Sequence, residues 1–470
     1  SEITEAKNNK PYFNMVLKEI RKVHKAIDEK LASLSDTAKV GNLVNVDSWV
    51  GGDRDGNSAV DSNMIRRVMA EQADVALNRY VRKLSPEKGK KSDSLRSLLD
   101  QHAPGYADKI VQRLIATMNQ FRFKAGDSLE SMKSVQDQES YLHSLRDLLS
   151  QIDQGVPTEK IEQQVEGLRQ KYLSASVRSD SSLDKDTNVD LAYQNSQQLL
   201  DDLEALRPIL LKGIPDAKAG QVAQDKLSRF IREVNGAGFH TAAVDVRQNS
   251  SAHEHTVGYL LKQAGIASNY AALPEADKQQ VLWTHLLDPN AKPLYNKDKH
   301  HHFDPEIVKE MGIFHAISEV QKQYGEKAMP NYIIANTETV SDMLEPMVLL
   351  KEVGLAGKGG LKMNIIPLIE TVPDMKNGRE IVGNLLNNAQ YRTWLKNDRN
   401  NMQQVMVGYS DSNRLDGPIA SNWHIQKTLT SMQDICKENG VDLLFFHGRG
   451  GVVARGAGVD YEREIGGQPD

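Results

Sequence analysis

The chain has 470 residues, of which 39% are hydrophobic and 26% charged, a composition typical of a globular protein with a sizeable core. Its formal net charge of −5 gives no reason to expect nucleic acid or an anionic membrane as a partner, so a basic site must be a local concentration of cations. No apolar run approaches the roughly 20 residues of a membrane-spanning helix, and a single cysteine, Cys436, excludes an intrachain disulfide and favours a reducing, cytoplasmic location.

The first half of the chain is dominated by helical patterns. Residues 12–35 carry apolar side chains at helical spacing and predict a helix, and residues 43–50 predict one short strand that runs into a glycine turn. From about residue 60 to 235 the pattern is helical in several segments, and the leucines of residues 191–214 are spaced for packing in a bundle. We therefore predict a helical region over residues 1–240 that holds one early strand and a long helical insertion.

Residues 241–470 change to alternating strand and helix patterns. Apolar runs without polar alternation are typical of parallel strands that are covered by helices, and strands that alternate with helices indicate parallel β/α topology. We expect five β/α units here, the last one ending in a glycine-rich loop, which makes six strands with the early one. The five runs are residues 241–248, 331–338, 363–371, 403–411 and 442–449.

Charged residues follow the predicted strands at their carboxyl ends. In a (β/α)8 barrel the catalytic residues lie on the loops after the strands, whereas a doubly wound open sheet gathers its ligand at one switch point. We therefore favour a predominantly α-helical protein around a (β/α)8-type barrel, with about six of the eight strands in this chain, over an open sheet. The charges at the strand ends are Asp53, Arg54, Arg247, Glu338, Glu370, Asp411 and Arg449.

Two of these carboxylates, Glu370 and Asp411, follow long apolar strands and predict a metal site. Carboxylates from neighbouring strands suit Mg²⁺ or Mn²⁺, which prefer oxygen ligands and keep positions for water and substrate. The alternative is that each carboxylate pairs with an arginine across the barrel mouth. Arg247, Arg449 and Arg455 would add positive charge, and a metal with several arginines can stabilise a transferring phosphoryl group or an enolate.

The segment FFHGRGGVVARGAG, residues 445–458, places Arg449 and Arg455 among five glycines. Glycine lets the backbone approach a ligand closely, and arginine holds phosphate or carboxylate through two parallel hydrogen bonds. The segment has no GK[ST] ending and is therefore not a Walker loop. It predicts a loop that wraps a small anion, with a plain surface loop as the alternative. The residues alone indicate a Mg²⁺-dependent barrel enzyme for a small phosphorylated or carboxylated metabolite and leave the reaction open.

We interpret the remaining histidine clusters and the single cysteine as structural residues rather than as ligands or catalysts. The adjacent histidines of residues 300–302 point in different directions, which disfavours a metal site there. His253 and His255 could approach the barrel mouth, although hydrogen-bonded loop histidines are more common. Cys436 is expected to be a buried thiol near the end of a helix.

Five motifs lie in order along the chain: SWVGGDRDGN (48–57), VDVRQNS (244–250), PLIETVPDM (367–375), VMVGYSDSN (405–413) and FHGRGGVVARG (446–456). In this order they resemble the motifs of the phosphoenolpyruvate carboxylase family, and the resemblance covers the chain from about residue 12 to its end. It implies a largely helical protein around an eight-stranded barrel that uses Mg²⁺ or Mn²⁺ and no biotin. It also implies that phosphoenolpyruvate and bicarbonate are converted to oxaloacetate and phosphate.

The resemblance implies roles for individual residues. Glu370 and Asp411 match the carboxylates that bind the metal in the family. Arg247 and Arg449 match arginines that bind the phosphate of the substrate or of carboxyphosphate. Trp49 matches a tryptophan associated with the bicarbonate pocket.

The glycine-rich loop would be a mobile lid over the anion. Arg455 matches the loop arginine that serves catalysis and, in the inhibited state, contacts an acidic allosteric inhibitor such as aspartate or malate. Arg414 stands where the family has a catalytic lysine, three residues after the aspartate of the metal site, and arginine keeps the charge without readily losing a proton. The family habit further implies a homotetramer.

The sequence departs from the family pattern in two more places. It contains no His-Pro pair, although the family has a catalytic histidine in a Thr-Ala-His-Pro-Thr-Glu stretch, and it stops at GGQPD, before the last barrel strand. Six strands would leave two exposed sheet edges, so we expect the chain to be part of a longer carboxylase. The alternative is a relative that only binds phosphoenolpyruvate or a similar anion. An aldolase or phosphotransferase on the same barrel is disfavoured by the five ordered motifs.

Overall fold

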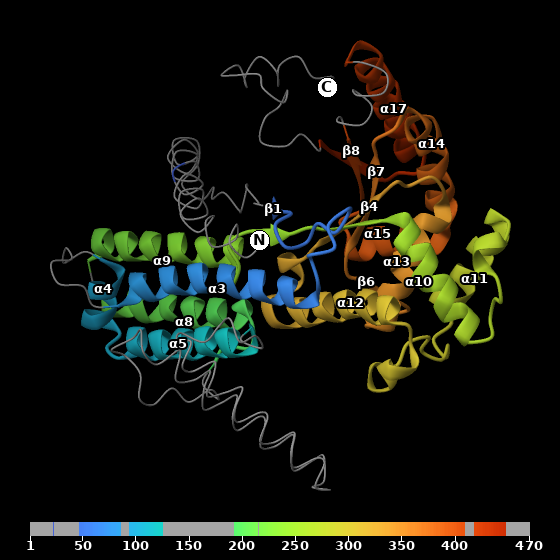
Figure 1. The fold of residues 1–470 in the computed structure, drawn as a ribbon. Coiled ribbons are helices and arrows are strands. Elements are labelled where there is room, and N and C mark those ends of the chain that lie inside the picture. The colour runs from blue at the N-terminus through green and yellow to red at the C-terminus, as the bar shows by residue number, and fades with distance from the viewer. Residues whose placement is uncertain are drawn as a thin grey trace, which may run out of the picture. The chain divides into compact units, whose positions relative to one another are not determined.

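The structure, a computed structural model, describes Lys22 and residues 47–85, 94–125, 192–214, 216–408 and 418–447 (Figure 1). The chain divides into two compact units. Unit 1 holds residues 1–46, 63–243 and 322–328, and unit 2 holds residues 47–62, 244–321 and 329–470. The helix predicted for residues 12–35 lies outside the described residues.

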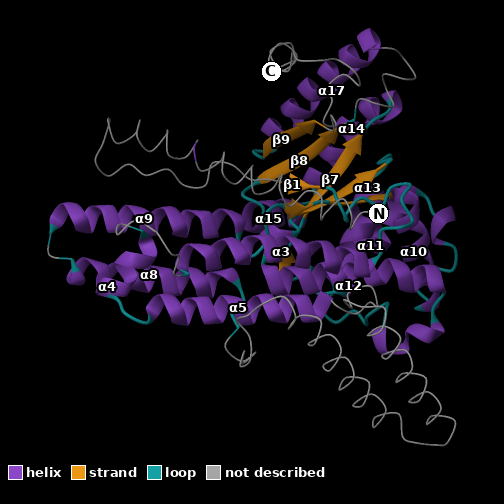
Figure 2. Cartoon of the chain, turned by 60° about the vertical axis from the view of Figure 1, so that its left-hand side comes forward, coloured by secondary structure: helices purple, strands orange, loops and turns teal. Residues whose placement is uncertain are grey.

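The described part of unit 1 consists of helices that lie side by side (Figures 1 and 2). The leucines predicted to pack in a bundle do so, because Leu199, Leu203, Leu206 and Leu210 are all buried along one helix. The side chain of Asn195 caps that helix at its first turn. The helices are α3 (Ser62–Leu84), α4 (Leu95–His102), α5 (Tyr106–Ala125), α8 (Ser196–Gly213) and α9 (Ala217–Ala237).

The centre of unit 2 is a five-stranded parallel sheet whose strands lie in chain order. Each predicted β-rich run overlaps one of these strands, so the five predicted strands are confirmed. A doubly wound sheet reverses its strand order at the switch point, whereas the described strands show the unreversed order of a (β/α) barrel. The closed eight-stranded barrel stays a prediction. The strands are β3 (Val246–Asn249), β4 (Asn331–Ala335), β7 (Asn364–Ile369), β8 (Met402–Val407) and β9 (Asp442–His447).

Helices connect the successive strands of the sheet. Three follow β3, namely α10 (Ser250–Gln263), α11 (Glu275–Leu287) and α12 (Pro305–Tyr324), and one, α13 (Val340–Glu352), follows β4. Two follow β7, namely α14 (Val372–Asn387) and α15 (Ala389–Asp398), and α17 (Pro418–Glu438) lies between β8 and β9. Short 3-10 helices are η3 (Tyr270–Ala272), η4 (Lys297–His302) and η5 (Glu326–Ala328). None of the helices in the described part of the chain is long and apolar enough to cross a membrane.

Four very short strands complete the elements of the part of the chain that the structure describes. β1 (Asp47–Ser48) falls in the run predicted as the early strand, whose other residues up to 46 lie outside the described part. The run 241–248 holds β2 (Ala243–Val244) as well as β3. The antiparallel hairpin of β5 (Ala356–Gly357) and β6 (Gly360–Leu361) was not predicted, because strands of two residues are too short for a periodic pattern.

The two faces of the sheet have different partners. On one face Tyr332 of β4 meets His253 of α10, and Gln403 of β8 accepts a hydrogen bond from Tyr391 of α15. Figure 2 shows α13, α14 and α17 beside the strands. Alternate residues point to the opposite face, where an apolar cluster forms. A helix-covered face backed by an apolar one is the arrangement that a barrel requires. The cluster consists of Ile333, Ala335, Ile366 and Leu368, with Met406 and Phe446 packed against it.

A row of polar side chains crosses the amino ends of the first three strands. Asn364 donates its amide to Asn331 Oδ1 at 2.8 Å, and Asn331 donates to Asp245 Oδ1 at 2.8 Å. Burial raises the pKa of Asp245 to about 7, with a further contribution from the nearby carboxylate of Asp47. Asp245 therefore keeps its proton in the folded protein at pH values where an exposed aspartate is ionised.

Replacement of Asp245 by Asn should stabilise the protein increasingly as the pH rises from about 4 to about 7. The raised folded pKa of Asp245 adds stability below pH 4, and this contribution is lost as the pH rises to about 7. An asparagine has no charge to desolvate. The free energy of unfolding of the variant, relative to that of the native protein, should therefore increase by on the order of 2–3 kcal/mol between pH 5 and pH 8. Thermal unfolding of both proteins at the two pH values measures this gain. A difference in Tm between the two proteins that does not change with pH would contradict the raised pKa of Asp245.

Candidate functional site

The carboxyl ends of β3, β4 and β7 are joined by hydrogen bonds through one residue, Asn336. The hydroxyl of Ser250, the first residue of α10, donates to the Asn336 carbonyl at 2.7 Å. The Asn336 N–H donates to Glu370 Oε1 at 3.3 Å. Asn336 has a φ of 56°, a conformation that asparagine tolerates better than most residues. This turn therefore fixes Glu370 at the edge where the three strands end.

Glu370 follows β7 directly and is half-buried. The turn after it is fixed by a capping box, in which Asp374 accepts the Thr371 N–H at 3.0 Å at the start of α14. The N–H of Gly408, just after β8, donates to the Ile369 carbonyl at 2.8 Å. A Cβ at position 408 would lie 2.7 Å from the Glu370 Cβ, so this close approach requires glycine. The sequence thus brings the end of β8 directly beside Glu370.

Arg247 on β3 binds Asp53 side-on. Its Nε donates to Asp53 Oδ1 at 2.7 Å and its Nη2 to Asp53 Oδ2 at 2.8 Å, and Asp55 Oδ2 lies 3.8 Å from Nη2. Burial alone would lower the pKa of Arg247, but the hydrogen bonds and charge of Asp53, with the charges of Asp55 and Glu370, raise it above its ordinary value. The guanidinium is therefore a fixed cation, and its Nη1 edge lies outside the fork with Asp53.

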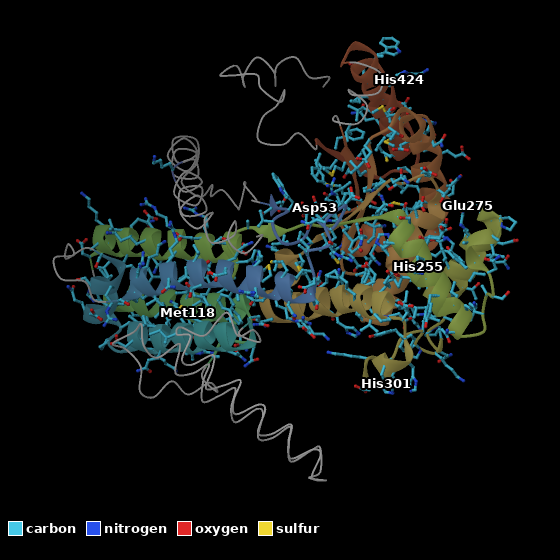
Figure 3. All side chains as sticks on the ribbon, viewed as in Figure 1. Asp53, Met118, His255, Glu275, His301 and His424 are labelled. Atoms are coloured by element: carbon cyan, nitrogen blue, oxygen red, sulfur yellow. The ribbon has the colours of Figure 1, made fainter. Side chains whose placement is uncertain are left out.

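Trp49 belongs to the same segment as Asp53, which Figure 3 labels. The Trp49 carbonyl accepts the N–H groups of Gly52 and Asp53, both at 3.0 Å, and so closes the turn before Asp53. The side chain itself is exposed, with 61% of the residue surface accessible. The structure therefore places Trp49, Asp53 and Arg247 in one part of unit 2.

Four predicted site residues, Asp411, Arg414, Arg449 and Arg455, lie outside the described residues, as does the loop from residue 448 onward. Along the chain they follow β8 and β9, whose last residues are Val407 and His447. Their predicted roles stay predictions. The remaining three are Trp49, Arg247 and Glu370. Arg247, the second residue of β3, interacts electrostatically with Glu370, which directly follows β7.

The chemistry of Glu370 fits one half of the predicted metal site, because carboxylate oxygens are the preferred ligands of Mg²⁺ and Mn²⁺. Within the described ranges no group of three or more His, Cys, Asp or Glu side chains could hold a metal ion. Asp411 falls outside those ranges, so the Glu370–Asp411 pair stays a prediction.

The histidines and the cysteine have structural surroundings. His253 lies on α10 rather than in a loop, its Nε2 is 2.8 Å from the Tyr332 hydroxyl, and burial lowers its pKa to about 4. His255 and His301 are exposed, and Figure 3 labels both away from Asp53. Cys436 is buried near the end of α17, and burial raises the pKa of its thiol to about 11, which confirms the structural interpretation.

Sequence reasoning missed two residues that organise this edge. Asn336 directly follows an apolar strand, so its position was a usable signal that a turn there has a specific conformation. Glu310 lies within α12 and forms a buried ion pair with Arg54. Nothing in the spacing of a helix shows which distant arginine one of its carboxylates will meet.

A parallel sheet in chain order, with a fixed arginine on its first strand and a carboxylate at its carboxyl edge, defines a β/α protein of the class that binds small ligands at that edge. The family model for phosphoenolpyruvate carboxylase matches residues 2–470. The chain belongs to the phosphoenolpyruvate carboxylase family.

Curated relatives support the same membership. Phosphoenolpyruvate carboxylase of Ralstonia nicotianae is 30% identical over 468 residues, which cover 96% of this chain and 43% of the relative. The enzymes of the same name from Paraburkholderia xenovorans and Corynebacterium glutamicum are each 30% identical, over 97% and 96% of this chain and 43% and 45% of their own lengths. The chain thus spans less than half the length of these relatives.

Replacement of Gly52 by Ala should destabilise the segment that holds Arg247. A Cβ at position 52 would lie 2.1 Å from the backbone oxygen of Asp245, so the backbone must move. We expect a loss of about 2 kcal/mol in the free energy of unfolding, measured by urea denaturation. Gly359 has no atom within 4 Å of such a Cβ, and its replacement by Ala should change stability by less than about 0.5 kcal/mol. Equal stability of the two variants would contradict this.

Proposed function

We propose that the protein is a phosphoenolpyruvate carboxylase that converts phosphoenolpyruvate and bicarbonate to oxaloacetate and phosphate. The observation that carries the proposal is the family match over residues 2–470, together with relatives that bear this name. The charged edge of the sheet supports it, since Arg247 offers a cation for phosphate and Glu370 a carboxylate for a metal. The ordered motifs make a different reaction on the same sheet a weaker candidate.

The proposed chemistry needs positive charge near the phosphoryl oxygens and near the enolate oxygen. An oxygen of bicarbonate attacks the phosphorus and the bond to the enol oxygen breaks, which gives carboxyphosphate and the enolate of pyruvate. Carboxyphosphate then breaks down to CO₂ and phosphate, and C3 of the enolate forms a bond to CO₂. Arg247 would bind a phosphate oxygen through its Nη1 edge while Asp53 holds the opposite edge. Arg449 would bind phosphate as well, and Trp49 would line the bicarbonate pocket.

Glu370 and Asp411 would hold Mg²⁺ or Mn²⁺, and no biotin would take part. The bound metal would supply Lewis-acid stabilisation of negative oxygen. Arg414 would contribute positive charge where the family has a lysine.

The glycine-rich loop would close over the site and exclude water that could protonate the enolate. Arg455 on this loop would serve catalysis in the active state and bind an acidic inhibitor such as aspartate or malate in the inhibited one. We further propose a cytoplasmic homotetramer as the working assembly.

The proposal is tested by measuring phosphate and oxaloacetate formed from phosphoenolpyruvate, with and without bicarbonate and after removal of divalent cations with EDTA. We expect equal amounts of the two products and loss of both when bicarbonate or the metal is withdrawn. Phosphate release that persists without bicarbonate would indicate a different reaction. Binding of phosphoenolpyruvate without turnover would indicate a relative that only binds the anion.

Replacement of Glu370 by Gln should lower kcat by at least about 100-fold, because a neutral amide is a poor ligand for Mg²⁺ and leaves the charge of the metal uncompensated. Mn²⁺ affinity, measured by electron paramagnetic resonance, should fall in parallel. Glu338 is the matched control, since it also follows a strand of the sheet but is exposed and lies at the start of α13. Glu338→Gln should retain activity, and similar losses in both variants would argue against a metal role for Glu370.

A further inference from the structure

The segment of residues 52–54 holds Arg247 by its backbone and by its side chain. The Arg247 N–H donates to the Gly52 carbonyl at 3.0 Å, and the Arg54 N–H donates to the Arg247 carbonyl at 2.9 Å. Between these two contacts, Asp53 binds the guanidinium through the fork described above. A shift of this segment would therefore move the Arg247 side chain with it.

The segment is in turn fixed by a buried ion pair between Arg54 and Glu310. Arg54 Nη1 donates to Glu310 Oε1 at 2.8 Å and Nη2 donates to Oε2, so the two groups meet end-on. Both side chains are buried, with 5% and 8% of their surface exposed. Gln248, the residue after Arg247, also donates to Glu310 Oε2, at 3.4 Å. Glu310 thus contacts the residue that follows each member of the Arg247–Asp53 fork.

The charges of this pair depend on each other. Burial alone would raise the pKa of Glu310, but the hydrogen bonds and charge of Arg54 lower it below its ordinary value. Burial also opposes the charge on Arg54, and Glu310 raises its pKa again. His253 lies nearby but is neutral at pH 7, because burial lowers its pKa to about 4. Arg54 is therefore the cation that keeps Glu310 ionised.

A buried ion pair of this kind is a poor source of stability. Its desolvation cost offsets much of the attraction, and apolar residues of similar volume are often as stable in the same place. What the end-on fork provides and apolar residues do not is a fixed orientation. Arg54 is the residue after Asp53, and the orientation of the Asp53 carboxylate decides the direction of the Arg247 guanidinium.

We propose that Arg54 and Glu310 are positioning residues for anion binding by Arg247. The pair fixes the segment of residues 52–54, the segment fixes Asp53, and Asp53 directs the Nη1 edge of Arg247 toward the phosphate of the substrate. This inference rests on the proposed function, because it takes the ligand of Arg247 to be the phosphate of phosphoenolpyruvate. It assigns the orientation of that cation to a residue of α12, Glu310, through its contacts with Arg54 and Gln248.

The test replaces the pair by apolar residues in the double variant Arg54→Met/Glu310→Leu. Removing both charges leaves neither one buried alone, so Tm should stay within a few degrees of the native value. We expect the KM for phosphoenolpyruvate to rise about tenfold with a smaller change in kcat, and the Kd for inorganic phosphate, from calorimetry, to rise similarly. A merely structural role would lower the amount of folded protein and leave KM and Kd unchanged.

A matched control is the double variant Lys278→Met/Glu254→Leu, which removes another ion pair of unit 2 between α11 and α10. It should keep the native KM. If the Arg54/Glu310 variant does not fold, Arg54→Lys decides, because lysine keeps the charge but not the fork. A raised KM in Arg54→Lys supports the inference, and a native KM overturns it.

The two proposals fail in different ways. If the native protein neither turns over nor binds phosphoenolpyruvate, the proposed function is wrong. If the native protein binds it and the folded double variant has the same KM, the function stands and the positioning role of Arg54 and Glu310 is wrong.

Discussion

Parallel pairing between strands that follow one another in the chain is the constraint on which unit 2 depends. Val246 pairs with Tyr332, Asn331 with Asn364, and Leu368 with Met406. Because the strands are parallel, all their carboxyl ends lie at one edge, and because their order does not reverse, the connecting helices can all cover the same face. The charged residues of that edge and the apolar cluster of the other face are both consequences of this pairing.

The arginines near this sheet are compensated by carboxylates of the chain itself. Arg247 and Arg54 are each held by a carboxylate in a fork, and burial makes these contacts stronger than they would be in water. A cation held along one side of its guanidinium can still donate from the other side. Orientation rather than the mere presence of charge is thus what the surrounding carboxylates contribute to Arg247.

Family membership and structure supply different kinds of information about this chain. The match over residues 2–470 indicates the class of chemistry, while the structure shows that Arg247 on β3 and Glu370 after β7 interact electrostatically. Asn336 and Gly408 have no reactive groups, yet the first donates to Glu370 and the second lets β8 approach it. The candidate site therefore depends on residues without catalytic chemistry of their own, one of which, Asn336, lies outside the five ordered motifs.

Local patterns in the sequence determined the five strands and the buried leucines of α8, because strands covered on both faces give continuous apolar runs and a bundle helix buries one face at helical spacing. The burial of Cys436 was expected from the usual burial of free cysteine. The ordered motifs determined the family. Only the tertiary structure decided that Arg54 meets Glu310, that Arg247 is bound by Asp53, and that His253 lies on a helix against Tyr332. These contacts join residues far apart in the chain, and their partners are chosen by which helix packs beside which strand, a choice that leaves no periodic trace in the sequence.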